Sequence, residues 1–305
     1  ADPRSALTGG SDAARRDAVA DLAEAVLLSV GRRWTLTQGA RVSAQLRAGI
    51  RFLDLRLRDR GGAVWTAHRF YLVPLATVVA DVAAFVDAHP TEVVIVKLRR
   101  DWDNRPADEV RAGALAAALA PLRPYLVPWA DRGVGVGALA AAGKRVVLLK
   151  GDEDPVLTSP LPAGVWTDYY RTRWHNTPWG GTLCAALGAA DATAWATPGR
   201  LNWHQPLLSP STDSILDAAL TGAVGALAPA HHGSLRAAAR AANRDVVAPW
   251  LAALPAPWAG VVATDWASPP LIAAILRLND AGRPRPARPW ACPGASCDRS
   301  RDCPP

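Results

Sequence analysis

Residues that suit phosphate chemistry accompany three apolar runs in the first third of the chain. The runs cover residues 49–57, 63–67 and 92–98, and the residues that they carry or lead into are Asp54, Arg56, His68 and Lys97. An imidazole exchanges protons near neutral pH, whereas a guanidinium keeps its charge and presents a planar fork to phosphate oxygens. We therefore expect these side chains to form a site for a phosphate ester. The alternative for Asp54 and Arg56 is a buried ion pair with a structural role.

The rest of the chain alternates between strand-like and helix-like segments. The pattern predicts strands over 145–150, 164–168, 199–204 and 258–264, and helices over 74–89, 107–120, 213–227, 232–244 and 269–279. Short apolar strands between helices favour a parallel sheet that is covered on both faces. We expect an α/β fold of the TIM-type (β/α) barrel class, whose active site lies at the carboxyl ends of the strands. A doubly wound open sheet is the alternative, but no glycine-rich nucleotide-binding motif follows an early strand.

Composition narrows the class of protein further. The chain has 305 residues, of which 50% are hydrophobic, and we expect a barrel over 1–281 followed by a Pro-, Arg- and Cys-rich tail over 282–305. It contains no apolar run long enough for a transmembrane helix. The net charge of +7 favours an anionic membrane or a phosphorylated ligand. The alternative is that the charge has no functional meaning, because a GC-rich coding sequence would give the same excess of arginine over lysine. We expect no nucleic-acid partner.

The cysteines bear on the compartment of the protein. There are four, and they are Cys184, Cys292, Cys297 and Cys303. An even count, in a chain that begins without methionine as a processed form would, favours a secreted protein with one or two disulfides. Three pairings remain open. A zinc site is disfavoured, because the tail contains no histidine and no paired Cys-x-x-Cys.

The stretch WTLTQGARVSAQLRAGIRFLDLRLRD, followed by His68 and HPTEVVIVKL, resembles the X domain of phosphatidylinositol-specific phospholipase C. The likeness is to the bacterial enzymes and to the animal X-domain-containing proteins, and it continues more weakly over 143–150, 164–170 and 258–265. The resemblance implies a distorted β/α barrel and a phosphodiesterase that uses two histidines. One histidine takes the proton from the inositol 2-hydroxyl, which attacks phosphorus, and the other protonates the departing diacylglycerol oxygen.

The resemblance also implies a role for individual residues. His68 matches the second histidine, the general acid, and Arg56 matches the arginine that binds the phosphate, with Asp54 as its neighbour on the strand. Asp265 matches the carboxylate that orients the first histidine. The residues implied for substrate binding are Lys97 and the pair Asp168 and Tyr170, with Lys150 as either a ligand or a solvent-facing residue. Because an arginine can supply the charge that calcium gives in the metal-dependent branch, we expect no catalytic calcium and no other cofactor.

The first histidine of the implied pair is missing. The best match to its Gly-Thr/Ser-His-Asp-Ser motif places Ser11 at the histidine position and Asp12 after it, and no histidine precedes His68. A serine hydroxyl is no general base at pH 7, and losing a positioned acid–base group removes about 10²–10⁴ of rate. We therefore favour a catalytically impaired relative. Another histidine, such as His204, or a different alignment of the N-terminal segment are the alternatives.

Two functions remain open at this stage. The first is a secreted pseudoenzyme that binds a phosphoinositide or other anionic lipid headgroup, a membrane surface or an unknown protein partner. The second is an active, metal-independent phospholipase C that acts on phosphatidylinositol lipids or anchors. Trp174 and Trp179, with arginines around them, could lie at the barrel mouth and face a membrane, although packing in the core is the default for tryptophan.

Overall fold

The computed structural model describes residues 31–101, 110–150, 164–167, 170–189, 200–211, 215, 233–255 and 260–279. Within these ranges the strands form a six-stranded sheet, in the order β3-β2-β1-β4-β5-β6, and a three-stranded sheet, in the order β7-β8-β9. The strands are β1 (Phe52–Arg60), β2 (Ala63–His68), β3 (Phe70–Pro74), β4 (Val94–Arg100), β5 (Val146–Lys150), β6 (Val165–Thr167), β7 (Tyr170–Trp174), β8 (Leu201–Gln205) and β9 (Val261–Val262).

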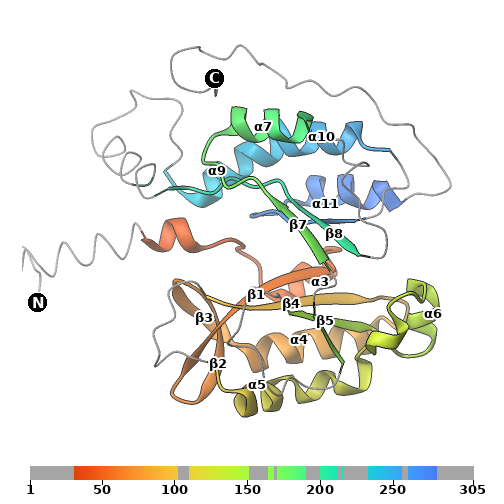
Figure 1. Ribbon diagram of the computed structural model, residues 1–305. Helices are drawn as coiled ribbons and strands as arrows, with labels where there is room; N and C mark the ends of the chain where they lie inside the picture. The colour runs from red at the N-terminus through yellow and green to blue at the C-terminus, as the bar shows by residue number, and fades with distance from the viewer. Residues whose placement is uncertain are drawn as a thin grey trace, which may run out of the picture.

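The helices lie outside the two sheets, and Figure 1 shows α4 and α5 on one side of the molecule and α7, α9, α10 and α11 on the other. The α-helices are α3 (Val42–Arg47), α4 (Leu75–Ala88), α5 (Ala112–Leu119), α6 (Val136–Ala141), α7 (Gly180–Ala189), α9 (Leu235–Ala242), α10 (Ala248–Ala253) and α11 (Pro269–Leu276). Short 3₁₀ segments cover η2 (Ala120–Tyr125), η3 (Trp129–Asp131) and η6 (Arg277–Asn279), and a π-helical turn covers η5 (Asn243–Val247). Among the described residues, none of the helices has the length and apolar character needed to cross a membrane.

Helix α4 illustrates why the sequence pattern predicted these elements well. Its buried residues recur at helical spacing and pack on the six-stranded sheet; they are Leu75, Val78, Val79, Val82, Phe85 and Val86. Pro74 precedes the first turn, where a missing N–H costs nothing. The helix predicted over 74–89 is confirmed, and so are the cores of the strands predicted over 145–150 and 199–204.

The prediction of a parallel sheet was wrong for the pairs that β2 makes with β1 and β3. Strands β1, β4, β5 and β6 are parallel, but β2 pairs antiparallel with both β1 and β3. Only Gly61 and Gly62 separate β1 from β2, and both have positive φ, at 61° and 87°. A connection of two residues closes a hairpin, whereas a parallel pair needs a crossover of a dozen residues or more.

The inner faces of the two sheets meet to form the interior of a distorted α/β barrel, as predicted. Thr167 ends β6 and Tyr170 begins β7, so the chain passes almost directly from one sheet into the other. Trp203 of β8 packs on Phe52 of β1, with ring centroids 5.1 Å apart, and on Tyr170 at 5.7 Å. The described strands therefore enclose an interior although they form two sheets and not one closed ring.

A bridging segment, Thr35–Gln38, joins the two sheets on the side opposite to β6 and β7. The carbonyl of Thr35 lies 2.7 Å from Nδ1 of His68, at the end of β2. The loop after β9 holds the same segment: Trp266 donates from its indole to Leu36 at 2.8 Å and from its backbone to Thr37 at 2.7 Å. A Cβ at the next residue, Gly39, would lie 2.5 Å from the Trp266 ring, so the close approach requires glycine.

Several predicted features lie outside the described residues. They are Ser11, Asp12, Asp168, the tail over 282–305, the start of the helix predicted over 107–120, and the helix predicted over 213–227 apart from Ile215. Cys184 lies buried in α7, whereas the three other cysteines are outside these ranges. The helix predicted to end at Pro121 continues as the 3₁₀ segment η2.

Candidate active site

The register between β1 and β4 brings the predicted phosphate-binding residues together. Asp54 is paired with Lys97, and Arg56 with Arg99. Paired residues in neighbouring strands point to the same face of a sheet, and alternate residues share that face. Since Phe52 and Ile95 of these strands pack in the barrel interior, the side chains of Asp54, Arg56 and Lys97 also point toward it.

Lys97 forms a fixed positive charge inside the barrel. Its side chain is 1% exposed, and Nζ lies 3.7 Å from Oδ1 of Asp54. The ammonium also lies over two rings of the second sheet, 4.2 Å from the centroid of Trp203 and 4.8 Å from that of Tyr170. A carboxylate and two aromatic faces compensate the desolvation of a buried ammonium. Tyr170, predicted to contact substrate, therefore lies beside Lys97.

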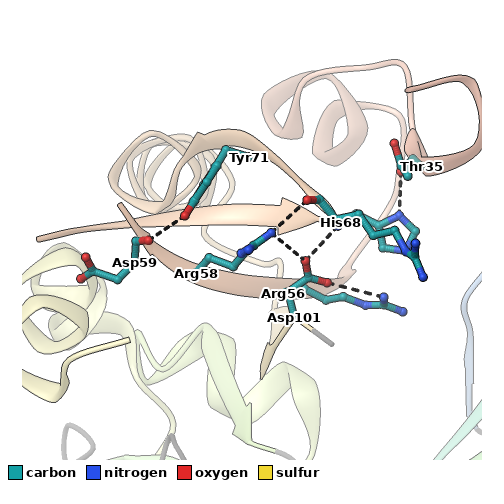
Figure 2. Close-up of polar contacts among 8 residues, drawn as sticks. Thr35, Arg56, Arg58, Asp59, His68, Tyr71 and Asp101 are labelled. Carbon is teal, nitrogen blue, oxygen red and sulfur yellow. Dashed lines mark hydrogen bonds and ion pairs between the residues drawn. The ribbon is translucent and has the colours of Figure 1, made fainter. Parts of the chain in front are cut away.

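Arg56 lies beside a carboxylate that the sequence reasoning had not singled out. Its Nη1 is 3.8 Å from Oδ1 of Asp101, which follows β4 directly and whose side chain is fully buried. Figure 2 shows Asp101 between Arg56 and Arg58, whose Nη1 lies 3.9 Å from Oδ2 of Asp101. At these separations the contacts are ion pairs and not hydrogen bonds. We call Asp54, Arg56, Lys97 and Asp101 the charged cluster.

The pKa of Arg56 reflects both its burial and its charged neighbours. Burial lowers the pKa of its guanidinium, and the adjacent Arg99 lowers it further. Three carboxylates raise the pKa in part compensation, and they are Asp54, Asp101 and Asp265. Because an arginine stays protonated across the working pH range, the guanidinium is a permanent cation in a partly desolvated site. Such a cation interacts more strongly with an anion than one in water does.

His68 is held in one tautomer by the bridging segment. Because a carbonyl can only accept, the contact with Thr35 requires Nδ1 to carry the proton, and Nε2 is then the nitrogen that exchanges protons with a substrate. Burial lowers the pKa of His68 below its ordinary value of about 6.5, and the charge of Arg56 lowers it further. The ring is therefore mainly neutral at pH 7.

Asp265 reaches the interior from the loop after β9. Its backbone carbonyl accepts a hydrogen bond from Nδ2 of Asn243 at 2.8 Å, and Thr264 donates to Oδ1 of the same Asn243 at 2.6 Å. Burial raises the pKa of Asp265 to about 7, the nearby Arg56 lowers it and Asp54 raises it. The carboxyl group is therefore half ionised near neutral pH, which is the range of an acid–base catalyst.

Two predicted residues are not brought to the cluster. His204 is in register with Val262, which packs among the helices, and its ring lies 5.7 Å from that of Trp250 in α10. Burial, followed by Arg173 and His175, lowers the pKa of His204 to about 4. Lys150 is in register with Leu98, which packs in the helix-facing core. Both side chains thus belong to the outer face of their strands.

The sequence reasoning missed three contributors to the site. Thr35 acts through its backbone carbonyl, which carries no sequence signal. Asp101 lies three residues after the predicted run 92–98 that contains Lys97 and directly after the observed strand β4, and a carboxylate near a strand end was a usable signal. Trp203 lies two residues after Leu201 and shares the inner face of β8 with it, but its partners across the barrel are visible only in the folded chain. Within the described ranges, no three or more His, Cys, Asp and Glu residues gather as a metal site would require.

Comparison with known proteins gives one partial sequence match and several matches of fold. No protein-family model matches the chain. PI-PLC X domain-containing protein 1 of Danio rerio is 38% identical over 71 residues, which is 22% of this chain and only 23% of that protein's length.

The solved structures match over most of the chain. Phosphatidylinositol-specific phospholipase C of Staphylococcus aureus has a TM-score of 0.57 at 14% identity, over 81% of this chain and 85% of that one. The enzyme of Listeria monocytogenes has a TM-score of 0.58 at 15% identity, over 82% and 86% of the two chains. The TM-scores show a shared fold, and at identities this low they show the fold alone. The partial sequence match and the shared fold together support the resemblance of this chain to the PI-PLC-like X-domain family.

Proposed function

We propose that the barrel binds the phosphodiester headgroup of a phosphatidylinositol-type lipid and that its cleavage activity is lost or strongly impaired. The observation that carries the proposal is the charged cluster itself. Arg56 and Lys97 are cations held on one face of adjacent strands by Asp101 and Asp54, with His68 beside them. Two fixed cations in a partly desolvated barrel suit a phosphate anion, and the fold is shared with enzymes named for this substrate.

Each residue then has a defined part in binding or proton transfer. Arg56 contacts the phosphoryl oxygens, while Lys97 and Tyr170, with Asp168, contact the inositol ring. Nε2 of His68 donates the proton to the departing diacylglycerol oxygen. His68 is mainly neutral without ligand, and a bound phosphate raises its pKa because the negative charge favours the imidazolium.

The impaired activity follows from the residue at the position of the general base. Ser11 stands where the family motif has a histidine, and a hydroxyl cannot accept the proton of the inositol 2-hydroxyl at neutral pH. Binding needs only the cations and the ring contacts, so it survives the loss of the base. We propose that such a protein uses its barrel to recognise a lipid headgroup or a partner that presents an equivalent anion.

One observation favours a second candidate function, an active and metal-independent phospholipase C. The pKa of Asp265, near 7, makes its carboxylate a possible base in place of the missing histidine. This mechanism needs Asp265 ionised while His68 is protonated. Since the pKa of His68 is lowered and that of Asp265 is raised to about 7, only a minority of molecules are in the required form at any pH. The second candidate is therefore a slow enzyme.

Release of diacylglycerol from phosphatidylinositol vesicles, with and without EDTA, separates the two candidates. We expect wild type to match His68→Ala, and Ser11→His to gain about 10²-fold or more, because it restores the base. The control is His89→Ala, since His89 is an exposed residue at the end of α4. If wild type turns over the lipid, and His68→Ala abolishes this turnover while His89→Ala keeps it, the proposal of impaired cleavage is contradicted. The protein would then be an active phospholipase C.

We further propose a secreted protein that meets a membrane through the rim around Trp174 and Trp179. These rings are 40% and 37% exposed, Arg171 beside them is also exposed, and membrane binding is named for the Staphylococcus aureus enzyme. Replacing both tryptophans with alanine should weaken sedimentation with anionic vesicles. The matched control is Trp129→Ala, since Trp129 is 43% exposed but precedes α6 in a different part of the fold. Equal losses in both variants would argue against a specific rim.

A further inference from the structure

The turn that follows His68 is held in a conformation that its residue disfavours. Arg69 has a φ of 63°, in the left-handed region that residues with a Cβ rarely adopt. Both of its backbone polar groups are bound by side chains, one from β1 and one from the residue that follows β4. Its N–H donates to Oδ2 of Asp101 at 2.8 Å, and its carbonyl accepts from Nη1 of Arg58 at 2.9 Å. Two side chains thus compensate the strain of this turn.

Asp101 connects this turn to the phosphate-binding arginine. One carboxylate oxygen binds the Arg69 N–H and lies 3.9 Å from Arg58, while the other lies 3.8 Å from Arg56. The carboxylate is fully buried, and the backbone N–H of Asp101 donates to the carbonyl of Leu57 on β1 at 3.2 Å. A single rigid carboxylate therefore contacts both β1 and the end of β2.

Arg58 is itself fixed, which makes the connection stiff. Its guanidinium stacks on the ring of Tyr71 at 5.1 Å, and Tyr71 donates from its hydroxyl to the carbonyl of Asp59 at 2.9 Å. Figure 2 shows the contacts that run from Arg58 through Asp101 to Arg56 and to the turn at His68, and beside them the hydrogen bond between Tyr71 and Asp59. Displacing Asp101 would release the turn and the arginine together.

We propose that Asp101 is a positioning residue, whose carboxylate aligns the guanidinium of Arg56 and the ring of His68 toward the same phosphate. This inference rests on the proposed function. Its charge argues for this role and against a role in binding. A buried carboxylate repels a bound anion, so its charge alone would weaken the site. Removing the charge should therefore tighten phosphate binding if Asp101 acts only through charge, and weaken it if Asp101 acts through position.

The test compares Asp101→Asn with Asp59→Asn. Asp59 is a matched control, because its carboxylate is also buried and lies on β1, but it binds the N–H of Gly62 at 2.8 Å and faces Arg111 at 3.6 Å. The measurements are the dissociation constant for inorganic phosphate at pH 7, by calorimetry, and the titration of the His68 ring, by NMR.

We expect Asp101→Asn to bind phosphate about tenfold more weakly, the size of loss seen when a partner that orients a binding group is removed. The pKa of His68 should also fall, since the charge of Asp101 raises it in wild type. Asp59→Asn should leave both values close to those of wild type.

Equal or tighter phosphate binding by a folded Asp101→Asn would overturn the positioning role while leaving the proposed function intact. A wild type that binds no phosphate would overturn the proposed function, and the positioning role with it. If Asp101→Asn does not fold, hydrogen exchange of wild type decides instead. A slowly exchanging Arg69 amide that phosphate protects further supports the role, and an amide that exchanges as fast as an open turn overturns it.

Discussion

The two halves of the barrel hold their site residues in different ways. In the six-stranded half, the residues of the charged cluster on β1 and β4 stand in register, so the ladder of backbone hydrogen bonds fixes which side chains meet. In the three-stranded half, Asp265 follows a strand of only two residues, β9, and its place depends on Asn243 and on the bridging segment. Strand register positions one side of the site, and loop contacts from distant parts of the chain position the other.

The halves differ in their ion pairs as well. Lys97 and Asp54 form a pair inside the barrel at 3.7 Å, whereas Arg244 and Asp245, in the π-helical turn η5, form a pair at 2.6 Å that is largely exposed. The shorter pair contributes less, because water screens its attraction and solvates either partner alone. Burial, more than distance, decides which charges matter in this molecule.

The largest effect is expected where the halves touch. Trp203→Ala removes a ring that is 1% exposed and that contacts both Phe52 and Lys97 across the interior. We expect a loss of about 3–5 kcal/mol in the free energy of unfolding, measured by urea denaturation. Trp129→Ala, at an exposed ring, is the control. A smaller loss for Trp203→Ala than for this control would mean that the halves are not held together through the aromatic contact.

Breaking the buried ion pair comes next. Lys97→Met leaves the carboxylate of Asp54 without its cation inside the barrel, and we expect a cost of about 3 kcal/mol in urea denaturation. Adding Asp54→Asn should recover part of this loss, because no uncompensated charge then remains. Asp245→Asn should leave the unfolding midpoint where it is. Equal effects of Lys97→Met and Asp245→Asn would contradict the contrast between buried and exposed pairs.

The pH dependence of stability should single out Asp265. Its pKa is about 7 in the folded chain and about 3.9 when unfolded, so between these values the native state binds a proton that the unfolded state does not. Stability therefore falls as pH rises from about 4 to 7, and the full cost is present above 7. We expect Asp265→Asn to stabilise the protein by about 2 kcal/mol at pH 8 and by little at pH 4. The same difference from wild type at both pH values would show that burial does not shift this pKa.

The smallest effect is expected at the bridging segment. Trp266→Phe removes the indole N–H that donates to Leu36, at a partly exposed site, and should cost about 1 kcal/mol. Hydrogen exchange should quicken at the amide of Trp266 and not in β1. Trp166→Phe, which removes a buried indole bond to Val127 at 2.8 Å, should cost more. If Trp266→Phe costs more than Trp166→Phe, the bridging segment is held more rigidly than the buried contact between Trp166 and Val127.

The sequence predicted the strands and helices best where one periodicity dominates. The apolar run of β5 and the helical spacing of α4 were both read correctly, because burial of a continuous apolar face determines them locally. Strand β3 was missed, since its residues form a strand only by pairing with β2. The antiparallel pairing of β2 was not predicted, because hydrophobic patterns do not report strand direction.

The sequence predicted the types of the site residues, but it did not predict the face of the sheet on which each side chain lies. Lys97 and Lys150 both stand near the carboxyl end of an apolar strand, yet the register places Lys150 beside Leu98 on the helix side. His204 was considered as a replacement base because it is a histidine near a strand end, and it packs instead on Trp250. A shift of one residue along a strand reverses the face, and only the paired sheet determines it.

By itself, the sequence determined the alternation of strands and helices, the barrel class and the residue types available for phosphate chemistry, because local periodicity and side-chain chemistry are properties of the linear chain. Only the tertiary structure decided the tautomer of His68, through the carbonyl of Thr35, and the pKa of Asp265, through its burial. It also decided that Asp101 joins Arg56 to the turn after His68. These properties depend on desolvation and on contacts between residues that are distant in the chain, and no local pattern encodes either.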